Sequence, residues 1–183
     1  MKWHPKLSGV WLLVPISFWI SSCQPSQYIT PPTQSIDAQL NSRSAEDSPQ
    51  FSYDGRYLIY TSDRNGKRSV YLYDLQRRRS IKLPGLNQPG SMQSQADISA
   101  DGRYVVYRSE QLGKSDIFLY DRLTSQSQNL TKSFIGEVRY PSISGNGRFV
   151  SFARNRSGQW DIEIYDRGTG IDFSVPQNTV QPQ

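Results

Sequence analysis

The residues that could perform chemistry in this chain are few. Its 183 residues include one histidine, His4, and one cysteine, Cys23, and both precede the part in which strand-like sequence begins. Ser–His and Cys–His nucleophiles, and the usual zinc and haem ligand sets, need these side chains close together. The phosphate-binding glycine loop, the dinucleotide fingerprint and the Gly-x-Ser-x-Gly elbow do not occur in the sequence either. We therefore predict a protein that is not an enzyme and that uses no cofactor and no metal.

Paired carboxylates are the one remaining route to catalysis, because glycosidases use two Asp or Glu side chains. Asp161 and Glu163 are two residues apart in a strand-like segment, so they share one face of that strand. Most Asp residues of the chain, however, recur at a fixed spacing, which favours a structural role. The segment Ser62–Gly66 resembles a calcium loop only superficially, because it lacks the later ligands and the Glu. A carboxylate-dependent hydrolase therefore ranks last among the candidate functions.

A nine-residue pattern that occurs three times sets the positions of these Asp residues. The copies are Ser52–Tyr60, Ser99–Tyr107 and Ser144–Phe152, and each is followed by an apolar strand that ends in Tyr-Asp. The second copy follows the first by 47 residues, and the third follows the second by 45. We interpret the recurring turn and strand-end residues as structural: Asp54, Gly55, Asp74, Asp101, Gly102, Asp121, Asn146, Gly147 and Asp166.

Each period contains four strand-like pieces, which is typical of a β-propeller blade. A short strand precedes the Asp-Gly or Asn-Gly turn, whose glycine supplies the positive φ of a tight hairpin. The second strand is apolar on both faces, as expected when sheets stack on either side of it. A third strand and a weaker fourth follow, and the last fourth strand is expected at Ile171–Val175. We predict an all-β protein with three four-stranded antiparallel propeller blades, at about 48–87, 95–133 and 140–175.

The repeat resembles the TolB-like family of propeller repeats, a relative of the WD repeats in which the third strand ends with Asp. The resemblance covers roughly residues 48–175 and rests on Ser-x-Asp-Gly-Arg plus Tyr-Asp in each copy. The third copy departs from the pattern, with Asn146 in place of the turn Asp. The resemblance implies a binding role, because such propellers in the bacterial periplasm present a rigid surface to envelope proteins.

The number of copies is small for a propeller, since closed rings have about four to eight blades. Three blades leave the outer faces of the first and third without a neighbour, and apolar faces of that size generally mark association surfaces. We expect either a second copy of the chain, combining as three plus three blades, or an envelope protein to cover these faces. The alternative is an open three-blade fragment that is stable alone.

The N-terminal segment has the parts of a secretory signal. Lys2 and Lys6 precede an apolar run, residues 7–20, that is shorter than the about 20 residues of a bilayer span. The run ends in Ile-Ser-Ser-Cys, which resembles the lipobox of bacterial lipoproteins. That resemblance implies a lipoprotein signal peptide at 1–22 and lipid attachment at Cys23. An ordinary signal peptide with an incidental cysteine is the alternative.

Two further segments are poor in large apolar side chains. Residues 23–47 and 176–183 cannot bury enough apolar surface to offset the entropy of ordering them, so we expect a disordered tether and a disordered tail. Together with a lipid anchor, the tether would hold the blades at the periplasmic face of a bacterial membrane, for which the outer membrane is one possibility.

The charge of the chain is mildly basic, +5, so we expect no nucleic-acid partner for an exported protein. The run Arg77, Arg78 and Arg79 has no counterpart in the other two periods and is the candidate binding site. It could contact acidic lipid head groups, an anionic envelope polymer or an acidic protein patch, and a solvated turn is the alternative.

The favoured function is a lipid-anchored envelope protein that binds other proteins. A module that recognises glycan or peptidoglycan is the second candidate.

Overall fold

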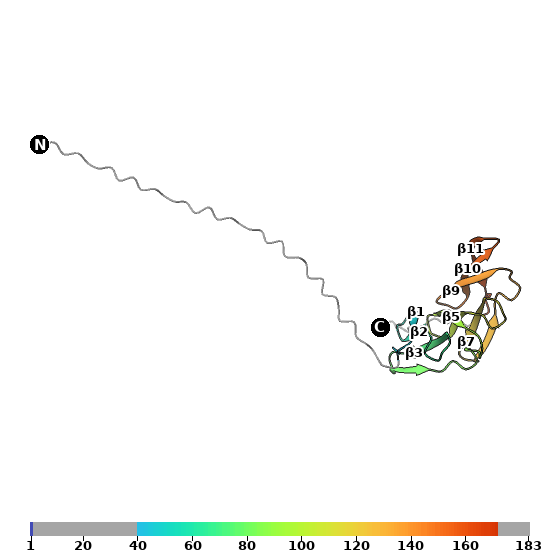
Figure 1. Cartoon of the computed structure of the whole chain (residues 1–183), viewed down its shortest axis with the longest axis horizontal. Coiled ribbons are helices and arrows are strands. Elements are labelled where there is room, and N and C mark those ends of the chain that lie inside the picture. Colours follow the sequence, from blue (N-terminus) through green and yellow to red (C-terminus); the bar gives the residue numbers. More distant parts are fainter. Residues whose placement is uncertain (2–39, 172–183) are drawn as a thin grey trace, which may run out of the picture. The chain divides into compact units, whose positions relative to one another are not determined.

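A computed structural model describes Met1 and residues 40–171 of the chain. These residues form eleven β-strands in three antiparallel sheets of four, four and three strands, with no helix among them (Figure 1). The predicted all-β class is thus confirmed. Blade one contains β1 (Glu46–Phe51), β2 (Tyr57–Ser62), β3 (Ser69–Asp74) and β4 (Arg79–Ile81). Blade two contains β5 (Gln93–Ile98), β6 (Tyr104–Ser109), β7 (Asp116–Asp121) and β8 (Gln126–Asn129), and blade three contains β9 (Glu137–Ile143), β10 (Phe149–Arg156) and β11 (Gln159–Asp166).

Each blade is a meander, in which strands that follow one another in sequence are neighbours in the sheet. The register repeats from blade to blade, since Tyr57 lies opposite Asp74 and Tyr104 lies opposite Asp121. The first strand of each blade lies at one edge of its sheet, and β5 contacts both β1 and β9. These three are therefore the inner strands. The turns that follow them lie at one end of the blades, which we call the glycine-turn end.

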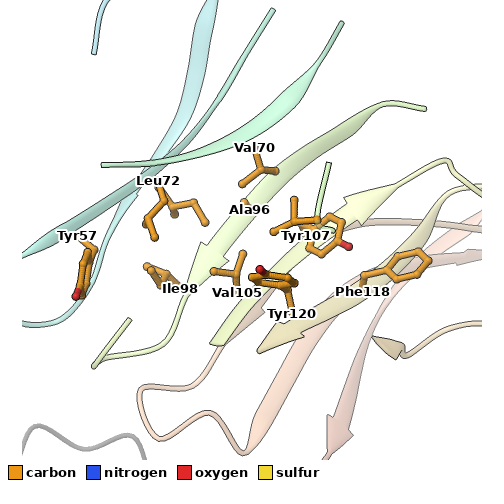
Figure 2. Close-up of a cluster of buried hydrophobic side chains, with 11 residues drawn as sticks. Tyr57, Val70, Leu72, Ala96, Ile98, Val105, Tyr107, Phe118 and Tyr120 are labelled. Carbon is orange, nitrogen blue, oxygen red and sulfur yellow. The ribbon is translucent and has the colours of Figure 1, made fainter. Parts of the chain in front are cut away.

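Two layers of buried side chains hold the blades together. The first layer is a cluster that includes Tyr57 and Leu72 of blade one and Val105 of blade two (Figure 2). The second layer lies between blades two and three and includes Val106 and Phe152. The consecutive residues Val105 and Val106 thus face opposite neighbours, because side chains alternate along a strand. This arrangement explains why the second strand of a blade is apolar throughout.

The outer face of blade one is apolar and buried. Leu58, Tyr60 and Tyr73 form a cluster there, and Leu40 and Leu75 pack against it. The exposed fraction of Tyr73 is 0%, so this side chain has no contact with solvent. We call this cluster the blade-one end face.

The outer face of blade three is apolar and exposed. Phe149, Ile162 and Ile164, which we call the blade-three end face, have exposed fractions of 38%, 73% and 69%. The residues at the same repeat positions in blade two include Ile117 and Leu119, which are buried in the layer against blade three. The side chains that form an interior in blade two are therefore on the surface in blade three.

The structure adds detail at the predicted boundaries. β1 begins at Glu46 and Leu40 packs on blade one, so the end of the segment expected to be a tether contacts the fold. Blade three has three described strands, and its expected fourth strand lies outside the described residues except for Ile171, which packs against the second layer. The expected signal peptide, Cys23 and the expected tail also lie outside them. No described helix is long and apolar enough to cross a membrane.

Candidate binding surface

The recurring turn residues make hydrogen bonds within their own turns. In the first copy, the Ser52 hydroxyl donates to Asp54 Oδ1 over 2.6 Å, and the Arg56 amide donates to the same oxygen. The Gly55 amide donates to the Ser52 carbonyl, with Gly55 at a φ of +67°. The third copy is equivalent because the Asn146 side-chain oxygen accepts the same two bonds. The side chains used in this way are those of Asp54, Asp101 and Asn146.

An ion pair in each blade connects the turn to the end of the third strand. The N···O distances are 3.1 Å for Arg56–Asp74, 3.0 Å for Arg103–Asp121 and 2.7 Å for Arg148–Asp166. Burial of Asp74 opposes its ionisation, but hydrogen bonds from the Arg77 amide and the Arg56 guanidinium lower its pKa. The Arg148 guanidinium lowers the pKa of Asp166 to about 2. These carboxylates are ionised and paired inside single blades, so they are unsuited to act as general acids.

A different set of contacts at the glycine-turn end joins one blade to the next. The Tyr57 ring of blade one lies against Gly102 of blade two, where any Cβ would overlap the ring. The Arg122 guanidinium of blade two lies 4.6 Å from the centre of the same ring and donates to the Gly102 carbonyl. We call this set of ring, glycine and arginine a clasp. Blades two and three are joined by an equivalent clasp of Tyr104, Gly147 and Arg167.

The basic run, Arg77–Arg79, lies at the edge of the blade-one sheet that is opposite the inner strand. Arg77 and Arg78 are in the turn between β3 and β4, and Arg79 begins β4. All three residues are exposed, and the Arg77 amide donates to Asp74 Oδ1 over 3.0 Å. Because β4 is the strand farthest from β1 in the sheet, the fold does not bring this run to the inner strands.

The inner strands contain a repeated irregularity that the sequence motifs do not predict. Ser48, Gln95 and Tyr140 have φ values of +51°, +51° and +54°, which are uncommon for residues other than glycine. Each lies where the register of the inner strand shifts, so each is part of a β-bulge. Bulges often lie next to functional sites, where they redirect side chains. The signal was present in the sequence, since these positions share the repeat spacing and Pro49 and Pro141 follow two of them.

The three bulges border one hollow of about 350 Å³, which we call the bulge surface. It is lined by Ser48 and Gln50 of blade one, Gln95 and Asp97 of blade two, and Tyr140 and Ser142 of blade three, among others. Gln95 Oε1 accepts from the Tyr140 amide over 2.9 Å, and Asp97 Oδ2 accepts from the Ser142 hydroxyl over 2.8 Å. Both bonds join two blades. The hollow is therefore a surface built across blade boundaries.

The chemistry of the bulge surface suits binding. Amide, hydroxyl and phenol groups line it, and these groups can donate and accept hydrogen bonds to a polypeptide or a sugar. Its carboxylate, Asp97, accepts hydrogen bonds from the Ser142 hydroxyl and the Ile143 amide. The pair considered for hydrolysis lies elsewhere, on β11, where Asp161 accepts from Gln159 and Glu163 lies 3.2 Å from Arg154. Within residues 40–171, no group of three or more His, Cys, Asp or Glu side chains could hold a metal ion.

Stacked antiparallel meanders with their first strands side by side define this protein as a β-propeller type, in which each sheet is one blade. The chain belongs to the TolB beta propeller domain family, whose sequence model matches residues 22–181. A comparison with curated protein sequences returned no match.

Solved structures with the same fold include two TolB proteins and a peptidase. TolB from Acinetobacter baumannii is 22% identical over 71% of this chain and 32% of its own, with a TM-score of 0.58. A putative TolB from Agrobacterium tumefaciens is 20% identical over 69% of this chain and 47% of its own, with a TM-score of 0.56. A puromycin-hydrolysing peptidase from Mycobacterium tuberculosis is 16% identical over 71% of this chain and 20% of its own, with a TM-score of 0.54. These likenesses show the fold alone, and the chain spans less than half the length of either TolB protein.

Proposed function

We propose that this protein is an exported lipoprotein that presents the bulge surface to another protein of the bacterial cell envelope. The observation that supports this most directly is the repeated bulge. Three inner-strand positions hold an unfavourable backbone conformation and border one hollow. Strained backbone persists where the surrounding structure enforces it, and it clusters at functional sites. Membership of the TolB propeller family favours a role in protein binding over a role in catalysis.

The proposed anchor is a lipid on Cys23, at the start of the segment that leads to blade one. Metabolic labelling with a fatty-acid probe tests it directly in the producing bacterium. The wild-type chain is expected to take up the probe, and a Cys23→Ala chain is expected to lose the label. Equal labelling of both chains would contradict lipidation at this residue and would leave the binding role untouched.

We propose that the blades carry out no reaction. The bulge surface has one carboxylate among its lining residues, Asp97, and glycosidase chemistry needs two. Asp161 and Glu163 bond to Gln159 and Arg154 of their own blade. The assay for this point is hydrolysis of cell-wall glycans by the wild-type chain and by Asp161→Asn. Activity that the substitution removes would contradict the proposal.

The binding role is tested by crosslinking in intact membranes followed by capture of the chain. The variant Gln50→Ala/Tyr140→Ala removes two side chains of the bulge surface, and Leu123→Ala is the matched control because Leu123 is exposed in the β7–β8 turn. We expect the double variant to lose at least about tenfold of its crosslinked envelope protein, as for other contact residues that dominate a binding site. The control should retain the protein. An unchanged yield with the double variant would contradict the proposed surface.

Two other outcomes of the same experiment would redirect the assignment. Retention on purified wall material, with no crosslinked protein, would favour glycan recognition over protein binding. Loss of the partner in Arg77→Gln/Arg79→Gln, but not in Gln50→Ala/Tyr140→Ala, would place the binding site on the basic run. Our expectation for the basic variant is a small decrease that high salt removes, because exposed charges act at long range and are screened.

A further inference from the structure

The two clasps use the rings of blades one and two and the glycines of blades two and three. The equivalent ring of blade three, Phe149, and the equivalent glycine of blade one, Gly55, belong to neither clasp. Tyr57 and Tyr104 are buried, each between an arginine of its own blade and the arginine of the next. Phe149 occupies the same position in blade three, where Arg148 lies 4.7 Å from its centre and the ring is partly exposed. At the other end of the stack, Gly55 is exposed and has open space where a Cβ would point. The stack thus begins with an unfilled glycine site and ends with an uncovered ring.

The residues at these two ends differ from the inner clasps in a matched way. The position of Arg122 and Arg167 is occupied in blade one by Leu75, which is half-buried. The position of Tyr57 and Tyr104 is occupied in blade three by Phe149. At the two ends of the stack, phenylalanine thus replaces the tyrosine of the clasp and leucine replaces its arginine. Leu75 and Phe149 are suited to each other as an apolar pair.

The backbone of the turns shows the same complementarity. Between blades two and three, the Ala100 amide donates to the Gly145 carbonyl over 3.0 Å, and no side chain stands at position 145. The position of Ala100 and Gly145 in blade one is occupied by Tyr53, with an exposed fraction of 86%. When blade three precedes blade one, the corresponding turn positions bring Tyr53, which is exposed in one chain, beside Gly145.

We propose that a second copy of this chain occupies both ends, with blade three of each copy packed on blade one of the other. Phe149 of one copy would lie against Gly55 and Leu75 of the other, and the same contact would be made twice. Head-to-tail contacts of this kind close into rings when the rotation allows. Two copies of three blades give six, which is within the range of about four to eight blades of closed propellers.

The cover on blade one is compatible with this contact. Leu40 lies shortly before β1 and packs on the blade-one end face. Leu86 lies shortly before β5 and is buried in the layer between blades one and two. The segment that leads into a blade thus packs on the face of that blade, and the preceding blade still adds to the layer. Ile162 and Ile164 of the second copy would complete it.

A closed ring would also complete the proposed binding site. In one copy the inner strands β1, β5 and β9 form the wall of the bulge surface on one side. In the ring, the inner strands of both copies would surround a common channel. This inference rests on the proposed function only in that respect, because the contact between the copies is independent of which molecule the bulge surface binds.

Sedimentation equilibrium of the full chain in mild detergent tests the proposal. We expect a species of two chains for the wild type and at least about a tenfold higher dissociation constant for Phe149→Glu. Adding Leu75→Arg to that variant should restore most of the affinity, because the two new charges would meet across the contact. Leu112→Glu is the control, since Leu112 is exposed in the β6–β7 turn at the opposite end of blade two.

A covalent test avoids the buried cluster. In Tyr53→Cys/Gly145→Cys, mild oxidation should yield disulfide-linked pairs of chains that the wild type and both single variants do not form. A single-chain wild type, a pair that Phe149→Glu leaves intact, or a double-cysteine variant without crosslinks would each overturn the ring. A single-chain protein that still captures its envelope partner would overturn the ring and leave the proposed function standing.

Discussion

The blade-one end face and the blade-three end face come from the same repeat, but solvent reaches them differently. Tyr73 and its neighbours are buried under Leu40 and Leu75, whereas Ile162 and Ile164 are exposed. The difference follows from chain direction, because each blade receives a covering segment from the residues that lead into it. The opposite face of a blade depends on the blade that comes next. A stack of such blades therefore has one end face that its leading segment covers in part and one end face that is exposed.

The largest expected difference in the free energy of unfolding is between two variants that each truncate one side chain of an end face. Tyr73→Ala should lower the free energy of unfolding by about 3 kcal/mol, because a fully buried aromatic side chain leaves a cavity. Ile164→Ala, on the exposed face, should change it by less than about 0.5 kcal/mol. Urea unfolding at low protein concentration measures both values. Equal losses would show that the blade-three end face is covered within one chain.

A smaller effect on the free energy of unfolding is expected for the clasp between two blades. Arg167→Ala removes the guanidinium that lies 4.1 Å from the Tyr104 ring centre and bonds to Gly147, at a cost of about 1–2 kcal/mol. Arg156→Ala, an exposed arginine at the end of β10, is the matched control and should cost less than about 0.5 kcal/mol. Thermal or urea unfolding distinguishes them. If the two variants were equally stable, the clasp would contribute nothing to the joining of the blades.

The smallest effect concerns the ion pairs at the two ends of the stack. The pKa values of Asp74 and Asp166 are lowered in the fold, so their contribution to stability is present above the unfolded value of about 4. It is lost as the pH falls through the folded values, which for Asp166 is about 2. Asp166 is exposed and Asp74 is buried, so only the first contribution should fall in high salt.

The difference in salt dependence between the two ion pairs is measured from urea unfolding midpoints at low and high salt. The pH is varied between about 2 and 5, where carboxyl groups titrate. Asp166→Asn should reduce the salt dependence of the wild-type profile in this range. Asp74→Asn should leave it in place while lowering stability at neutral pH. The reverse assignment would contradict the difference in exposure between the two pairs.

The sequence predicts well what depends on neighbouring residues. The Asp-Gly turns and the two-sided apolar strands are local patterns, so the sequence alone predicts where the blades lie. The clasp could not, because Arg122 and Tyr57 belong to different blades and neither residue indicates the other. The packing of Leu40 and Leu75 on the outer face of blade one was not predicted either, because Leu40 lies in a segment with few large apolar side chains. The bulges were not predicted because Ser48, Gln95 and Tyr140 share a backbone conformation but not a residue type.

The glycine at position 102 has a consequence for how this sequence can change by mutation. Its φ of +75° could be kept by Asn, but the Tyr57 ring leaves no room for any side chain. Position 102 therefore needs both a residue that tolerates a positive φ and the absence of a side chain. Asn would satisfy the first requirement but not the second. A new blade added to the gene by duplication would inherit the same codon together with its ring and arginine. Lengthening such a protein therefore needs no new contact, only another copy of an old one.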